Sequence, residues 1–187
     1  MGLSNGARRA HLDTSVILIF AGDDFVPRLH GHDRRDVLKG VQRALSHLKK
    51  SHVAARISMY ALGEAMAVIW QKKTSKPREA VKSLGEALRK VSELAGDLDV
   101  YVPPKGERDG SGFHATVAEL LQGDEFLEPR DAEILLSAVF DPNAESLYLL
   151  GESRLVSSRV VKELVQRRRS ELGMKKLNLQ NLLDEID

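Results

Sequence analysis

Four acidic residues stand at positions where the fold could bring them together. Asp13 follows a short apolar segment, and Glu152 follows the apolar residues 147–150. Glu64 and Asp131 each share a predicted helix face with apolar residues three or four positions away. No Lys or Arg shares either face, and a carboxylate turned towards a core is costly unless it is paired or binds a cation. The pattern therefore predicts an oxygen-rich site for Mg²⁺ or Mn²⁺.

The elements that would position these acids alternate between strand and helix. We expect short strands near residues 10–13, 53–57, 98–102, 146–150 and 174–179. We expect helices after residue 13 and over residues 33–50, 58–71, 77–95, 113–121, 129–140 and 154–172. This alternation predicts an α/β fold with three layers and a short, mainly parallel sheet. Ligands of such sheets bind outside the carboxyl ends of the strands, which is where all four acids fall.

Each acid also has a plainer interpretation. Asp131 stands in the first turn of its predicted helix, where a carboxylate stabilises the helix dipole, and Glu152 could be a surface turn residue. Taken one at a time, these interpretations are the commoner ones. The coincidence of four acids at one sheet edge is what favours a shared cation.

The charge is distributed unevenly along the chain although its net value is only +1. Residues 113–155 contain two Lys or Arg and nine Asp or Glu, which is typical either of a solvated face or of a cation site. The basic side chains that could bind the phosphates of RNA are Arg34, Arg35, Lys72, Lys73, Arg167, Arg168 and Arg169. For the last three, a helix end favoured by the helix dipole is an alternative explanation.

Several function classes are excluded by the residues that are missing. Without cysteine the chain has no disulfide framework, thiolate nucleophile or Cys-ligated zinc. No uninterrupted apolar run exceeds six residues, so we expect a cytoplasmic protein with no membrane partner. No Gly-rich loop follows the first strand, which argues against a dinucleotide site or a P-loop. The second aspartate that a haloacid-dehalogenase-type phosphatase needs after Asp13 is also missing.

The ordered set of motifs resembles the PIN-domain ribonucleases, a family that includes the VapC-type toxins. Residues 12–18 (LDTSVIL) are similar to the opening motif of the family, an aspartate followed by a small polar pair and an apolar helix. Ser58 with Glu64 six residues later resembles the second motif, and residues 131–134 (DAEI) with Ala138 resemble the third. The resemblance spans nearly the whole chain, and it implies a single PIN-like αβα domain over residues 1–187.

The end of the chain resembles the family less closely. Residues 149–153 (LLGES) stand where the family usually has an aspartate preceded by a threonine, but here Gly151 replaces the threonine and Glu152 the aspartate. Residues 173–183 resemble the closing strand and helical end. The chain is longer than a typical VapC toxin, with a helix and loop elaboration at about 77–112.

The resemblance implies a metal-dependent endoribonuclease that hydrolyses RNA. The implied ligands of one or two Mg²⁺ or Mn²⁺ ions are Asp13, Glu64, Asp131 and Glu152. Thr14 or Ser15 would bind the phosphate or hold the carboxylate of Asp13. The implied partners are RNA, an antitoxin protein and a second copy of the chain in a homodimer. The alternative is a catalytically weak PIN-like module that binds RNA or a protein, which the two replacements after residue 150 favour.

Overall fold

One five-stranded sheet, parallel throughout, organises the chain. The computed structural model describes residues 8–22, 25, 32–73, 76–103, 112–151 and 154–185. The strands are β1 (Arg9–Leu12), β2 (Ala54–Ser58), β3 (Leu98–Tyr101), β4 (Ala144–Leu149) and β5 (Asn178–Asn181), in the spatial order β3-β2-β1-β4-β5. The α/β prediction is confirmed.

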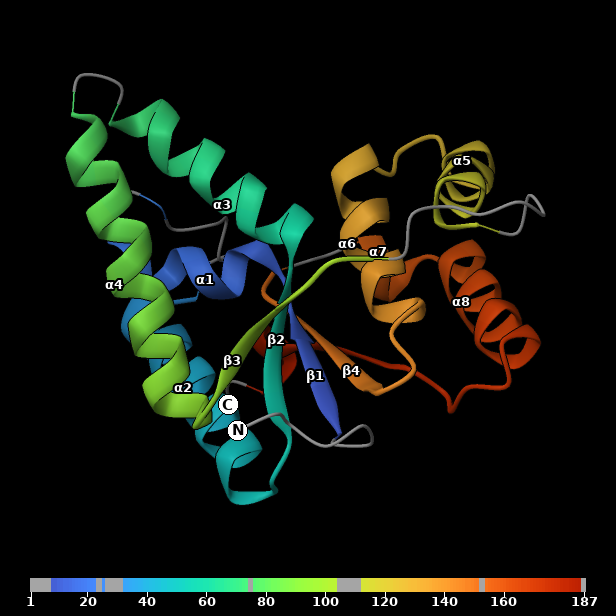
Figure 1. The fold of residues 1–187 in the computed structure, drawn as a ribbon, viewed down its shortest axis with the longest axis horizontal. Coiled ribbons are helices and arrows are strands. Elements are labelled where there is room, and N and C mark those ends of the chain that lie inside the picture. Colours follow the sequence, from blue (N-terminus) through green and yellow to red (C-terminus); the bar gives the residue numbers. More distant parts are fainter. Residues whose placement is uncertain are drawn as a thin grey trace.

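The helices fall into two groups. They are α1 (Thr14–Ala21), α2 (Arg34–Lys50), α3 (Met59–Lys72), α4 (Pro77–Ala95), α5 (Phe113–Gly123), α6 (Pro129–Val139), α7 (Arg154–Ser157), α8 (Arg159–Glu171) and the 3-10 helix η2 (Leu182–Glu185). In Figure 1, α1, α2 and α4 lie to one side of the strands, and α5, α6 and α8 lie to the other. This arrangement is consistent with three αβα layers, as predicted. Within the described residues, no helix is both long and apolar enough to cross a membrane.

The core forms where apolar helix faces meet the central strands. All four residues of β1 are buried, and the side chains of Val16, Ile17 and Ile19 in α1 have no exposed surface. In α6, Leu135 is likewise fully buried. Burial of each such side chain contributes on the order of 1.5–3 kcal/mol relative to its exposed state. These contacts hold the starts of the helices firmly against the ends of the strands.

Polar caps fix where the helices begin. Asp13 adopts an extended backbone and its side chain accepts a hydrogen bond from the Ser15 amide, which starts α1 directly after β1. Ser58 accepts from the Ala61 amide at 3.1 Å and starts α3 directly after β2. At the C-terminal end of α4, Gly96 closes the helix with a φ of 86°, a left-handed conformation that glycine tolerates. All three boundaries agree with the predictions from sequence.

Two predicted elements differ from the structure. The single helix expected over residues 154–172 is divided into α7 and α8, because the Ser158 side chain accepts from the Val161 amide and caps a new helix there. The same hydroxyl donates to Asp124 Oδ2 at 2.8 Å, which ties the break to the loop before α6. The last strand runs over Asn178–Asn181, later than the predicted 174–179.

Arg169 corrects one of the predicted RNA contacts. Its side chain is 1% exposed, and its guanidinium donates to the backbone oxygens of Asp141 and Ala144 at 2.7 Å each. It also donates to Lys175 O at 2.6 Å. Arg169 is therefore a structural residue that joins α8 to the connection between α6 and β4, and it cannot reach a phosphate in solution.

Arg169→Met should lower the free energy of unfolding by about 3–5 kcal/mol, because several carbonyl groups lose their hydrogen-bond donor. The melting temperature should fall by roughly 6–20 °C. Arg167→Met is the matched control: this neighbour is 52% exposed and forms ion pairs at the surface, so its loss should cost under about 1 kcal/mol. Equal melting temperatures for the two variants, measured by thermal denaturation, would contradict this role.

Candidate functional site

Three of the four predicted acids lie at the carboxyl edge of the sheet. Asp13 stands between β1 and α1, Glu64 lies in the second turn of α3 after the neighbouring strand β2, and Asp131 lies in the first turn of α6. Because α3 packs against both α1 and α6, the starts of the three helices come together above β1 and β2 (Figure 1). The expectation that these acids share one edge of the sheet is confirmed.

Hydroxyl groups from α1 orient two of the carboxylates. The Ser15 hydroxyl donates to Asp13 Oδ2, and the Ser15 amide reaches the same oxygen at 3.3 Å. Thr14 Oγ1 donates to Glu64 Oε2 at 2.6 Å, across the junction between α1 and α3. Of the two roles expected for this pair, Ser15 therefore holds the carboxylate of Asp13. Thr14 holds the carboxylate of Glu64, which the sequence did not predict.

The carboxylates crowd one another electrostatically. Burial, together with the negative charges of Asp13 and Glu64 and a smaller contribution from Glu128, raises the pKa of Asp131 to about 7. Burial also raises the pKa of Asp13, to which the charge of Glu64 adds, while hydrogen bonds from Ser15 and Thr14 oppose the increase. A carboxyl group that titrates near neutral pH beside two other acids is typical of a functional site.

One cation lies at the edge of this cluster. Arg130 Nη1 is 4.0 Å from Glu64 Oε1, and the arginine side chain is 56% exposed. No Lys or Arg shares the helix face of Glu64, as the sequence indicates, but the sequence did not predict that Arg130 would approach Glu64 from α6. At this distance and exposure the pair is weak, so Arg130 stays available to another anion.

The donor atoms of the cluster suit a hard divalent cation. All are carboxylate oxygens, which Mg²⁺ and Mn²⁺ prefer. Within the part of the chain that the structure describes, however, no three His, Asp or Glu side chains are arranged so that they could hold a metal ion. Mg²⁺ is commonly held by one or two carboxylates and several water molecules, and the carboxylate chemistry of the cluster fits an ion bound in that way.

The fourth acid, Glu152, lies outside the described residues. The residue before it is described. Gly151 has a φ of 120°, a conformation that residues with a side chain rarely adopt, and its amide donates to Asn181 Oδ1 at 3.1 Å. Glycine therefore suits this position better than the expected threonine, because the backbone conformation disfavours a side chain.

Four of the basic side chains that were predicted to contact RNA lie in two regions, the start of α2 and the end of α3. Arg34 begins α2 and donates to Ile19 O at 3.1 Å, and Arg35 is exposed beside it. Lys72 is exposed at the end of α3, and Lys73 Nζ lies 3.1 Å from Ser83 Oγ. These four are neither confirmed nor corrected as RNA contacts.

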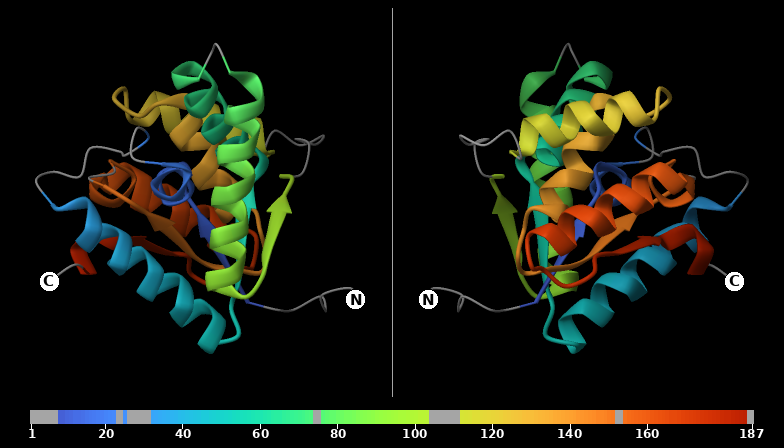
Figure 2. Two further views of the ribbon diagram at one scale, coloured as in Figure 1. Left: turned by 90° about the vertical axis from the view of Figure 1, so that its left-hand side faces the viewer. Right: turned by 90° about the vertical axis from the view of Figure 1, so that its right-hand side faces the viewer.

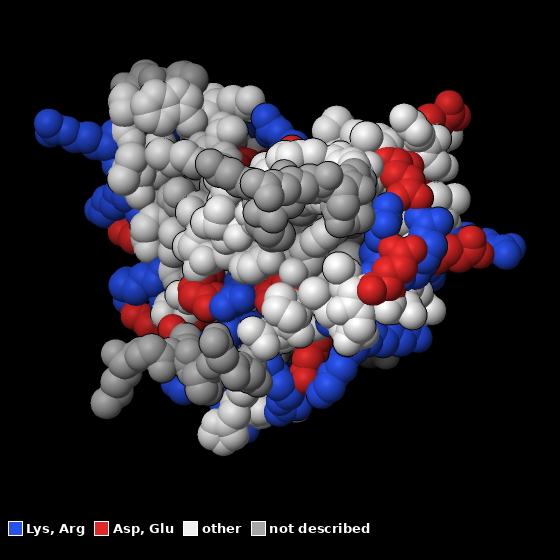
Figure 3. All heavy atoms as spheres, turned by 45° about the vertical axis from the view of Figure 1, so that its right-hand side comes forward, with Lys and Arg blue, Asp and Glu red and all other residues white. Residues whose placement is uncertain are grey.

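The two arginines before Arg169 in α8 are engaged with acids. Arg168 donates to Glu119 at 2.7 Å and to Glu171 at 2.8 Å, and Arg167 also pairs with Glu119. Figure 3 shows this intermixing of charges, with basic and acidic side chains side by side on one face of the molecule. The end of α8 is therefore a network of surface ion pairs and not a free basic patch.

A second polar cluster was not predicted from the sequence. His11 and Asp141, each 1% exposed, share a hydrogen bond of 2.9 Å, and Arg56 Nη1 donates to the same Asp141 oxygen at 2.7 Å. Although burial favours the neutral acid, these partners hold the pKa of Asp141 at about 2. The sequence feature that could have indicated this cluster is Arg56, a charged residue inside a predicted strand, because such a residue needs an acidic partner. His11 and Asp141 are buried and Arg56 is 14% exposed, and the cluster joins β1 and β2 to the start of β4.

Comparison with known proteins adds no assignment. No protein-family model matches this sequence, and no curated protein is significantly similar to it.

Asp131→Asn should stabilise the protein in a pH-dependent manner. The pKa of Asp131 is raised in the folded state, so its ionisation opposes folding once the pH exceeds the unfolded value near 4. The benefit of the neutral side chain should be negligible near pH 4, grow up to about pH 7 and stay constant above it. If the substitution raises the free energy of unfolding by about 2 kcal/mol, the melting temperature at pH 8 rises by roughly 4–8 °C.

The control for this experiment is Glu133→Gln, a neutralisation in the same helix that does not involve the cluster. Its effect on the melting temperature at pH 8 should be small. A lower melting temperature for Asp131→Asn at pH 8 would show that Asp131 is a helix-stabilising residue and not a member of a crowded cluster.

Proposed function

We propose that this protein is a metal-dependent endoribonuclease of the PIN-domain type, which hydrolyses RNA phosphodiester bonds with Mg²⁺ or Mn²⁺. The observation that supports this most strongly is the convergence of Asp13, Glu64 and Asp131 at the carboxyl edge of a parallel sheet. That edge is where ligands of open α/β sheets bind.

The chain's own residues supply several functions at this edge. The pKa of Asp131 is about 7 before a cation binds, so this carboxyl group can release its proton near neutral pH and become a charged ligand. Ser15 and Thr14 keep the carboxylates of Asp13 and Glu64 oriented, which limits the reorganisation needed during the reaction. Arg130 is exposed beside Glu64 and can pair with the phosphate of the substrate.

Asp13, Glu64 and Asp131 would hold the divalent cation, with Glu152 as the predicted fourth ligand. When bound, such an ion lowers the pKa of a water molecule and neutralises charge that develops on the phosphate. Neutralisation of the crowded carboxylates would at the same time remove the repulsion among them.

A second candidate function is a catalytically weak module that binds RNA or a protein. It is favoured by the absence, within the described residues, of three acids spaced to hold a metal ion. It is also favoured by the pairing of Glu64 with Arg130, which partly neutralises one proposed ligand.

The nuclease proposal is tested with a panel of fluorescently labelled RNAs in Mn²⁺ and, separately, in EDTA. The wild type should cleave in Mn²⁺ only. Asp131→Asn should reduce the rate at least about 100-fold, since it removes a charged ligand of the cation. Glu133→Gln, the matched neutralisation in α6, should stay within twofold of the wild type.

Cleavage that continues in EDTA, or an Asp131→Asn variant with unchanged activity, would contradict catalysis by these carboxylates. Binding of RNA without cleavage under every cation tested would establish the second candidate instead.

The proposal includes a homodimer, and for a toxin-like member an antitoxin protein as partner. Trp70 at the end of α3 is 42% exposed and Met59 at its start is 46% exposed, which leaves apolar surface for another chain. Light scattering at tens of micromolar should give twice the monomer mass, and Trp70→Glu should halve it. A wild-type chain of monomer mass would contradict the dimer.

A further inference from the structure

Helix α2 carries an unusual excess of positive charge. Its 17 residues include six Lys or Arg and one acid, Asp36. Four of its polar residues follow one another at intervals of four, four and three positions and so lie along one side of the helix. We call this set the basic stripe, and it consists of Lys39, Arg43, His47 and Lys50.

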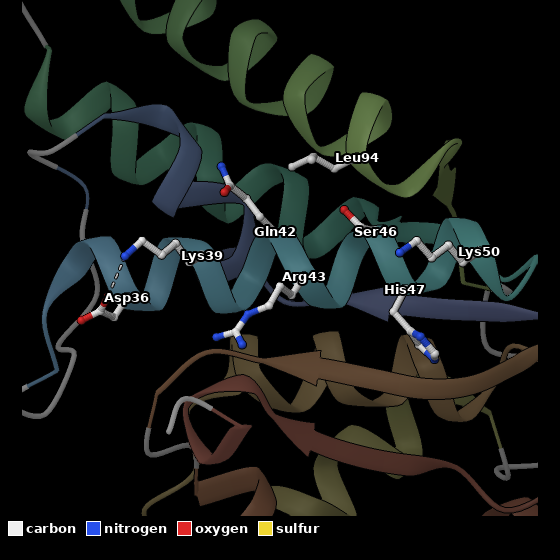
Figure 4. A pocket seen from close by; sticks show the side chains of 8 residues that line it. All are labelled: Asp36, Lys39, Gln42, Arg43, Ser46, His47, Lys50 and Leu94. Carbon is white, nitrogen blue, oxygen red and sulfur yellow. Dashed lines mark hydrogen bonds and ion pairs between the residues drawn. The ribbon is translucent and has the colours of Figure 1, made fainter.

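All four residues of the basic stripe line one groove, and Arg43 and His47 also line a second. The first has a volume of about 840 Å³ and lies between α2 and α4, where Leu94 of α4 contributes to its wall (Figure 4). The second has a volume of about 410 Å³ and is bounded by Tyr148 of β4 and Gln180 of β5. Figure 4 shows Arg43 and His47 pointing away from α4 towards these strands. A ligand lying along α2 would therefore have grooves on both sides of the helix.

Most of this charge is not used within the described structure. Lys39 pairs with Asp36 at 3.1 Å, but neither Arg43 nor Lys50 forms an ion pair with any residue whose position is described. His47 Nε2 lies 3.2 Å from the Ser51 hydroxyl. The contrast is with α8, whose Arg167 and Arg168 are paired with acids. Unpaired cations that line a groove are suited to an external polyanion.

The spacing along the stripe fits a chain of phosphates. Four helical residues rise by about 6 Å, so successive stripe residues are separated by roughly that distance along the helix axis. The stripe extends over about 16 Å of the helix. A nucleic-acid strand carries one negative charge per nucleotide, so a strand lying along the stripe would place several phosphates beside it.

We propose that α2 binds the phosphate backbone of RNA along the basic stripe. The choice of RNA over other polyanions rests on the proposed nuclease function, while the contact itself depends only on charge and spacing. Helix α2 is held in place by Arg34, which donates to Ile19 O in α1, and by packing against η2, which Figure 2 shows beside it. Since α1 also carries Thr14 and Ser15, the same helix supports the carboxylate cluster and the start of α2.

The test is RNA binding in EDTA, where cleavage does not interfere, measured by fluorescence anisotropy with a labelled single-stranded RNA. The double variant Arg43→Glu with Lys50→Glu should bind at least about tenfold more weakly. The salt dependence, as log Kd against log salt concentration, should become less steep by about 1.4, since each lost phosphate contact on a single strand accounts for about 0.7.

The matched control is Lys162→Glu with Lys176→Glu, which reverses two exposed lysines that line another groove, beside β5. It should bind within twofold of the wild type, and both double variants should keep the wild-type melting temperature. Equal losses in the two double variants would show that binding follows net charge and would overturn the proposal. So would binding of phosphatidylglycerol vesicles in place of RNA.

Cleavage of the same RNA in Mn²⁺ separates this inference from the proposed function. A wild type that binds through α2 but does not cleave supports the inference and contradicts the nuclease. A wild type that cleaves, with an α2 variant that binds RNA as the wild type does, supports the nuclease and contradicts the inference.

Discussion

The parallel pairing of β1 with β2 on one side and β4 on the other is the constraint on which the rest of the structure depends. With Leu12 in register with Ile57 and Tyr148, all three strands end at one edge, and the helices that follow β1 and β2 begin there. Asp13 is the first residue beyond this register, and the start of α3 brings Glu64 within reach of Thr14. The acidic cluster is thus a consequence of strand order and of the two caps, Asp13 and Ser58.

Two kinds of buried charge can be compared among the described residues. Arg169 and Asp141 each form hydrogen bonds with several partners, which connect separate elements of the fold. Their charges are therefore compensated although they are buried. Asp131 is different, because burial and the charges of Asp13 and Glu64 all oppose its ionisation. A fold that keeps such a group gains nothing in stability from it, which is the physical reason to connect the cluster with chemistry.

Much of this fold could be predicted because local signals agree with the tertiary arrangement. Pro129 starts α6, Ser58 starts α3, and Gly96 ends α4, each through a local backbone effect that the sequence displays. Contacts between distant segments could not be predicted in this way. Arg130 approaches Glu64, which lies 66 positions earlier in the chain. Arg169 is buried against the backbone of Asp141, 28 positions earlier. The last long helix is divided where Ser158 donates a hydrogen bond to Asp124, 34 positions earlier.

The most direct test of the crowded cluster is the carboxyl pKa of Asp131, measured by carbon-detected NMR in the protein without added metal and again with Mg²⁺. A value of about 7 is expected without metal, and it should fall in Asp13→Asn and in Glu64→Gln, because each removes a negative charge. Mg²⁺ should lower it further by favouring the ionised carboxylate. An ordinary value near 4 that neither substitution nor Mg²⁺ changes would contradict the convergence of these three acids on one site.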